Sequence, residues 1–217
     1  YDISYIVYDM KNNRIVETGC MLNDFIYKNE ELIKKAYYYS NVKNGYYDFK
    51  LMRDKKHYKI MKTKDILKRL NNIIDKYNIS IVSAYNSAFD YEAINNLYDM
   101  YGYVKNNFKY LFQLDILNLF IKALETNEEL REKYISFCKD NSYYANDKKI
   151  NYSTKAEVVY RFIKDNIEYI ESHTGLQDAY DELEILKYLR GFNIRYKLNT
   201  TINKSIYTNK NGLLRVS

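Results

Sequence analysis

Residues 79–90 read ISIVSAYNSAFD, and this stretch decides the fold class. Its first part, 79–85, is short, apolar and rich in β-branched residues, which predicts a buried β-strand. A polar turn follows at Asn86 and Ser87, and Asp90 then opens a helix predicted over 91–101. A strand that leads through a tight turn into a helix is typical of α/β proteins.

Elements on the N-terminal side of this stretch extend the sheet. The segments YDISYIVY (1–8) and RIVETGCM (14–21) flank a turn signal at 9–13, which predicts a β-hairpin. We expect a loop and then a helix over 23–40, whereas residues 41–60 give no clear pattern. Thr63 is a suitable N-cap for a helix over 63–77. Its apolar stripe comprises Ile66, Leu67, Leu70, Ile73 and Ile74.

Helices dominate on the C-terminal side. A weaker strand is predicted over 110–114, and four helices follow it, over 116–124, 128–140, 154–166 and 177–189. The expected fold is therefore α/β, with a mixed sheet flanked by helices. We expect one domain over 1–191 and a separate basic tail over 192–217.

Composition supports a globular protein and excludes several other classes. Of the 217 residues, 47% are apolar, which is enough for a sizeable core. The absence of proline, with only six glycines and two cysteines, excludes collagen, disulfide scaffolds and Pro/Gly-rich disordered chains. No apolar run approaches about 18 residues, so no membrane span is expected. Cys20 and Cys138 lack CxxC partners, and we interpret them as reduced core thiols of a cytoplasmic protein.

The net charge of +6 is concentrated at the C-terminal end. Residues 187–217 contain seven basic residues and no acidic ones, while the rest of the chain is close to neutral. Such a tail can contact phosphates, or it can simply be solvated. A third interpretation is that it packs onto the domain through an apolar stripe at Ile194, Leu198, Ile202 and Ile206.

Two polar stretches are candidates for a functional site. The first, Asn86 to Asp90, follows a strand at its carboxyl end, where α/β proteins place their ligands. Alternatively, this stretch has only a structural role, in which Asp90 is the N-cap of the helix and Phe89 packs in the core. The second, SHTGLQD (172–178), places His173 five residues before Asp178 at a helix start. An imidazole with a pKa near 6.5 can take a proton from water, although a plain helix start with a polar loop is the alternative.

Taken together, the motifs NxxFD and Hx4D resemble those of the DEDDh 3′–5′ exonucleases, a family that includes predicted phage exonucleases and the proofreading subunit of bacterial replicative polymerase. The stretch SHTGLQDAYDELEIL carries most of the likeness, and the resemblance covers about residues 1–190. It implies an RNase H-like fold in which four carboxylates bind two divalent cations, Mg²⁺ or Mn²⁺. Asp90 and Asp178 match two of these metal ligands, and His173 matches the general base. Asn86 and Phe89 match positions around the third carboxylate, where they would bind substrate or pack rather than react.

The chain departs from this family at its N-terminal end. The family's DxE pair on the first strand is absent, and residues 1–10 match the second strand, so that Asp2 and Asp9 do not replace it. We expect the DxE strand to lie upstream of Tyr1. Without it, the protein would be a catalytically inactive RNase H-like module that binds nucleic acid or protein. A third hypothesis is a subunit tethered by its basic tail to a replication or phage assembly.

The resemblance also implies partners and a location. The expected substrates are the 3′ ends of DNA or RNA, with single strands favoured. The expected location is the cytoplasm, which is the cytoplasm of the host if a phage encodes the protein. No membrane partner is expected. Among the remaining polar residues, we expect Asp115 to cap a helix and His57 to lie in a surface loop. Asp181, one turn after Asp178, could approach the site.

Overall fold

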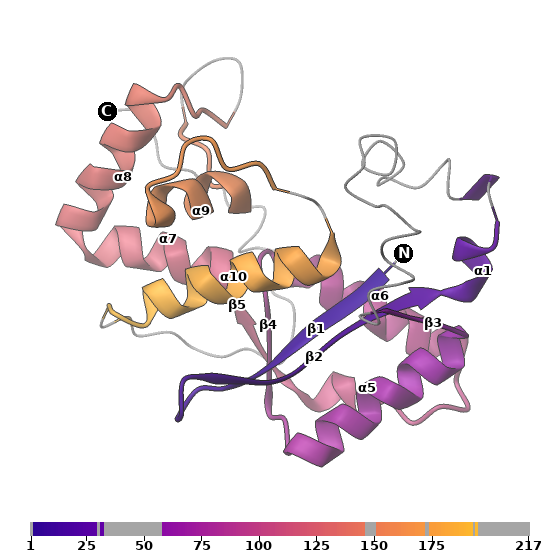
Figure 1. Ribbon diagram of the computed structural model, residues 1–217. Helices are drawn as coiled ribbons and strands as arrows, with labels where there is room; N and C mark the ends of the chain where they lie inside the picture. Colours follow the sequence, from indigo (N-terminus) through magenta and orange to yellow (C-terminus); the bar gives the residue numbers. More distant parts are fainter. Residues whose placement is uncertain are drawn as a thin grey trace. The chain divides into compact units, whose positions relative to one another are not determined.

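The computed structural model describes residues 2–29, 31–32, 58–145, 151–171, 174–192 and 194, and these form a mixed α/β structure (Figure 1). The chain divides into two compact units. The first comprises Tyr1–Asn78, Asn95–Phe108 and Glu171–Tyr180, and the second comprises Ile79–Ile94, Lys109–Ile170 and Asp181–Ser217.

The first unit contains a three-stranded sheet with the order β1-β2-β3. Strands β1 (Asp2–Asp9) and β2 (Arg14–Asn23) form the predicted antiparallel hairpin. The Asp9 carboxylate accepts hydrogen bonds from the backbone N–H groups of Lys11 and Asn12, both at 3.1 Å, which fixes the turn. Strand β3 (Tyr58–Met61) pairs in parallel with β2 and was not predicted.

Helix α5 (Thr63–Tyr77) covers the residues predicted for it, and Figure 1 shows it alongside the hairpin. The expected stripe is buried except for Ile74, which is half-buried. The predicted N-cap is wrong, because Lys62 occupies that position and supplies no side-chain cap. Thr63 is instead the first helical residue, and its hydroxyl accepts a hydrogen bond of 2.6 Å from the Asn23 side chain. A tertiary contact therefore uses the side chain that the local pattern assigned to capping. A short helix, α1 (Asp24–Tyr27), follows β2, and the rest of the helix expected over 23–40 falls mainly outside the described residues.

Glu17 on β2 joins the sheet to α5. Its carboxylate accepts hydrogen bonds from Tyr5 (2.8 Å), Arg69 (2.6 Å), Lys76 (2.9 Å) and Tyr77 (2.8 Å). Burial alone would raise the pKa of Glu17, but the hydrogen bonds and the positive charges around it lower that pKa to about 2. The ionised carboxylate is therefore the form that holds strand and helix together.

The second unit contains two parallel strands, β4 (Ile81–Ala84) and β5 (Phe112–Asp115), and most of the helices. Strand β4 is half-buried rather than fully buried as predicted. Tyr134 lies at the centre of the core, where its ring meets Phe120 edge-on at 4.9 Å and its hydroxyl donates to the Ser153 carbonyl at 2.6 Å. The helices are α6 (Ala88–Met100, which continues into the first unit), α7 (Ile116–Thr126), α8 (Glu128–Asp140), α9 (Ala156–Lys164) and α10 (Gly175–Leu189, which begins in the first unit), with a 3-10 turn at Phe108–Tyr110.

Several other predictions can be compared with the structure. Cys20 and Cys138 are buried free thiols, and burial raises the pKa of Cys20 to about 12 and that of Cys138 to about 11. Ile194 packs against the core of the second unit, as the packing interpretation of the tail requires. Residues 195–217 lie outside the described residues, so the role of the tail stays a prediction. Within the described part of the chain, no helix is long and apolar enough to cross a bilayer.

We predict that Glu17→Gln lowers the free energy of unfolding by about 1–2 kcal/mol at neutral pH, because charge-assisted hydrogen bonds become neutral ones. The native pKa of Glu17 lies below its ordinary value of 4.5, so its contribution is complete above that pH and is lost as the pH falls toward about 2. Urea unfolding at neutral and acidic pH measures both effects. Glu125→Gln is the control, since its ion pair with Lys122 is exposed. An unchanged acid dependence in Glu17→Gln would contradict the assignment.

Candidate functional site

Asp90 lies in the first turn of α6, directly after β4. The strand ends at Ala84, the turn passes through Asn86 in a left-handed conformation (φ 59°), and the helix begins at Ala88. The expected order of strand, turn and helix is confirmed, although the helix begins earlier than predicted and Asp90 is not its N-cap. Phe89 is 70% exposed, so the alternative that placed it in the core is wrong.

Asp115 connects this turn to strand β5 through hydrogen bonds. The residue ends β5, pairs in register with Ala84 at the end of β4, and is only 3% exposed. Its carboxylate accepts hydrogen bonds from the backbone N–H of Ser87 at 2.9 Å and from the Ser87 hydroxyl at 3.3 Å. It also accepts one from the N–H of Asn118 at 3.1 Å, which confirms its predicted role as a helix cap. The link to Ser87 was not predicted, because nothing in the sequence indicates which turn the cap faces.

The electrostatics of this edge favour a cation near Asp90. Loss of solvent around the carboxyl group, together with the negative charge of Asp115, raises the pKa of Asp90 to about 6. As a residue Asp90 is nevertheless exposed, so water screens part of both effects. A divalent cation at this position would oppose both effects and keep Asp90 ionised.

The start of α10 places Asp178 in the first turn of that helix, as predicted. Its N–H donates to the Thr174 carbonyl at 2.8 Å, and the helix begins at Gly175. The N–H of Gly175 donates to the carboxylate of Asp2, at the start of β1, at 3.0 Å. A Cβ atom at position 175 would lie 2.8 Å from that carboxylate and 3.0 Å from the Ser4 hydroxyl, so any larger residue would require the Asp2 side chain to shift. Asp2 therefore anchors the start of this helix.

Asp181, one turn further along α10, has a structural role. It is 4% exposed and accepts a hydrogen bond from the Tyr169 hydroxyl. Glu184 pairs with Lys164 and Lys187 at 2.5 and 2.8 Å. The expectation that Asp181 could approach a metal site is therefore not supported by its contacts.

The two motif aspartates lie in different units of the chain. Asp90 belongs to the second unit and Asp178 to the first, while His173 and His57 fall outside the described residues. The prediction that Asp90, Asp178 and His173 share one crevice therefore stays a prediction. Over the described ranges, no group of three or more His, Cys, Asp or Glu side chains is arranged to hold a metal ion.

Asp115→Ala should lower the free energy of unfolding by about 2–4 kcal/mol, because it removes both a helix cap and the buried acceptor of the Ser87 N–H group. Asn127→Ala is the matched control, since Asn127 caps α8 through one bond of 2.8 Å to the Leu130 N–H. That variant should lose about 1 kcal/mol. Urea unfolding of both variants measures the difference, and equal losses would show that Asp115 acts only as a cap.

Gly175→Ala should lower the free energy of unfolding by about 1–3 kcal/mol, because the added methyl group displaces the Asp2 carboxylate. Gly102→Ala provides the control, since the nearest atom to its added Cβ would be the Asp99 carbonyl oxygen at 3.7 Å, an ordinary contact. Thermal unfolding of both variants measures the effect. A loss at position 175 no larger than that at position 102 would contradict the close approach.

Comparison with known proteins does not extend these findings. No family model, curated protein or solved structure that was searched matches the chain. The resemblance to the DEDDh exonucleases therefore depends on the two motifs and on the local structure around them.

Proposed function

We propose that this chain is a metal-dependent 3′–5′ exonuclease with an RNase H-like fold, acting on phosphodiester bonds at the 3′ ends of DNA or RNA. One observation carries the proposal. Both motif aspartates lie in the first turn of a helix, and the helix that contains Asp90 follows a strand of a parallel pair. Such positions hold a carboxylate rigidly at the edge of a sheet where α/β enzymes bind their substrates.

The strand order is compatible with the finer assignment of the fold. Over the described residues, β1 lies at one edge of the three-stranded sheet. Consecutive strands pair in about two thirds of cases, so a strand carrying a DxE pair would be expected to pair with that edge. The motif of Asp90 and that of Asp178 would then contribute the other two carboxylates of the family's set.

The donors present suit a hard cation, although they do not complete a metal centre. Carboxylate oxygens are the ligands that Mg²⁺ and Mn²⁺ prefer, and the charge of Asp115 near Asp90 favours a cation there. The N-terminal strand carries no DxE pair, so Asp90 and Asp178 supply two ligands of the four that the resemblance implies. The proposal requires the remaining oxygen ligands to meet these two.

The roles of the chain's own residues follow from their chemistry. Two divalent cations, when bound, would activate a water molecule and stabilise the leaving 3′ oxygen. Asp90 and Asp178 would hold them, and the imidazole of His173 would take the proton from the attacking water. Asn86 lies in the turn before α6 and Phe89 lies in the first turn of that helix. Both are exposed, and the Phe89 ring would offer a face to an unpaired base.

A binding module without catalysis is the second candidate. It is favoured by the absence of a DxE pair from the N-terminal strand and of a three-ligand group among the described side chains. Such a module would bind nucleic acid or a protein partner, including a replication or phage assembly, and would release no nucleotides.

The natural chain that contains residues 1–217 should digest labelled 3′ ends when Mg²⁺ or Mn²⁺ is present and should stop in EDTA. Asp178→Ala should abolish the activity because a metal ligand is lost. His173→Ala should reduce kcat by about 10²- to 10⁴-fold, the usual effect of removing a general base. Product analysis of 3′- and 5′-labelled strands provides the measurement.

His57→Ala is the matched control, because it removes the chain's other histidine and should leave the rate unchanged. Activity in EDTA, or a wild-type rate in Asp178→Ala, would contradict the two-metal mechanism. Tight binding of nucleic acid with no release of mononucleotides would favour the binding module instead.

A further inference from the structure

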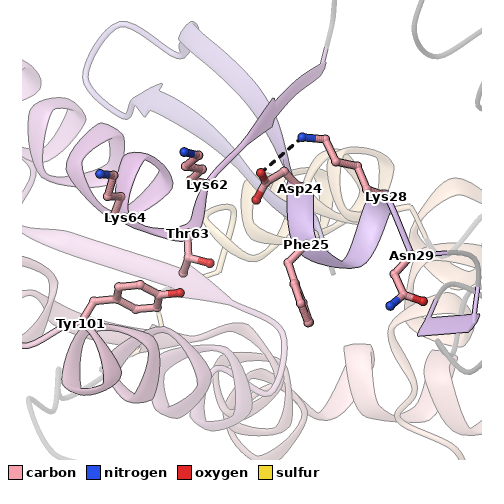
Figure 2. A pocket seen from close by; sticks show the side chains of 8 residues that line it. All are labelled: Asp24, Phe25, Lys28, Asn29, Lys62, Thr63, Lys64 and Tyr101. Atoms are coloured by element: carbon pink, nitrogen blue, oxygen red, sulfur yellow. Dashed lines mark ion pairs between the residues drawn. The ribbon is translucent and has the colours of Figure 1, made fainter.

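A basic and aromatic pocket lies within the first unit, between α1, the start of α5 and the end of α6 (Figure 2). Its volume is about 670 Å³, which is within the range of small-ligand pockets. Asp24, Phe25, Lys28, Asn29, Lys62, Thr63, Lys64 and Tyr101 line it.

The charge of this pocket is positive. It contains three lysines and a single carboxylate, that of Asp24, which pairs with Lys28 at 3.5 Å. Lys62 and Lys64 are exposed, and no carboxylate from the described segments forms an ion pair with either of them. Their ammonium groups are therefore available to an anion such as a phosphate.

The aromatic residues of the pocket are placed to contact an apolar or planar group. The Phe25 side chain is 71% exposed, which is unusual because phenylalanine is among the residues that are most often buried. Figure 2 shows its ring projecting away from α1, with Tyr101 on the other side of the opening. The Tyr101 ring meets Tyr103 edge-on, with centroids 6.1 Å apart, and this contact restricts the orientation of Tyr101.

We infer that this pocket binds single-stranded nucleic acid, with phosphates on Lys62 and Lys64 and an unpaired base against Phe25 and Tyr101. Exposed aromatic rings beside cationic side chains form the usual surface for single strands, because every base has a face that stacks. In a duplex both faces of each base are already stacked, so the aromatic contact selects unpaired strands. The inference deepens the proposed function by assigning it a single-stranded substrate and a binding surface of its own.

Equilibrium binding without catalysis tests this inference. We would measure fluorescence anisotropy of a labelled oligothymidylate with the full chain in EDTA, over a range of salt concentrations. Phe25→Ala should weaken binding by about 5- to 150-fold, the range expected for loss of one stacked base. Lys62→Ser with Lys64→Ser should lower the salt slope of log K by about 1.4, or about 0.7 for each lost phosphate contact.

Two control variants match these changes. Lys68→Ser removes an exposed lysine of α5 outside the pocket, and Tyr110→Ala removes an aromatic residue that is 69% exposed in the second unit. Both should bind as the wild type does. Because Phe25 and the two lysines are exposed, their variants should unfold at the wild-type temperature, which separates lost binding from lost folding.

The outcomes distinguish this inference from the proposed function. Unchanged affinity and salt slope in the Phe25 and lysine variants, or no binding of the oligothymidylate at all, would overturn the pocket assignment. Equal effects of Phe25→Ala on single strands and on duplex would overturn it too. Failure of the exonuclease assay, with Phe25-dependent binding intact, would instead reject the enzyme and retain the pocket.

Discussion

The buried carboxylate of Asp115 is the constraint on which the candidate site depends. It lies at the end of β5 and holds the N–H and hydroxyl groups of Ser87, in the turn that follows β4. The same carboxylate caps α7, so one side chain fixes two parallel strands, a turn and a helix start. Asp90, three residues after Ser87, takes its position from this turn. Because charged acceptors bind N–H groups more strongly than neutral ones, an aspartate suits this role better than the asparagine that caps α8.

Carboxylates serve the same purpose in the first unit. Glu17 links a strand to α5 through three donors of that helix, and Asp2 links the start of β1 to the start of α10. In each case an acidic side chain on a strand meets donors from a helix that lies far away in the sequence. These contacts determine which helix face meets which strand, since apolar packing alone would tolerate several alignments.

The sequence predicted local elements better than contacts between them. The bounds of α8 were predicted to the residue and those of α5 to within one residue, because both helices have a clear apolar period and polar residues at their ends. Strand β3 was missed because the residues before it show no alternation of polar with apolar or of large with small side chains. A four-residue edge strand also depends on its pairing with β2. The bond from Gly175 to Asp2 spans 173 residues, so no local pattern could reveal it. For the site, sequence placed Asp90 and Asp178 correctly in helical first turns, whereas their distance depends on the arrangement of two units.

The two proposed functions make different demands on the charges around Asp90. A surface that only binds nucleic acid needs positive charge, because each phosphate carries a negative one. The turn at the end of β4 instead presents Asp90, and the nearby Asp115 carboxylate adds a second negative charge. Two carboxylates repel a phosphate backbone unless a cation lies between them and the phosphate. The basic pocket of the first unit, with its lysines and exposed Phe25, has the composition expected of simple strand binding. The edge beside β4, with Asp90 exposed and Asp115 buried, has a different composition, and under the proposed exonuclease function a metal ion would be required between it and the phosphate.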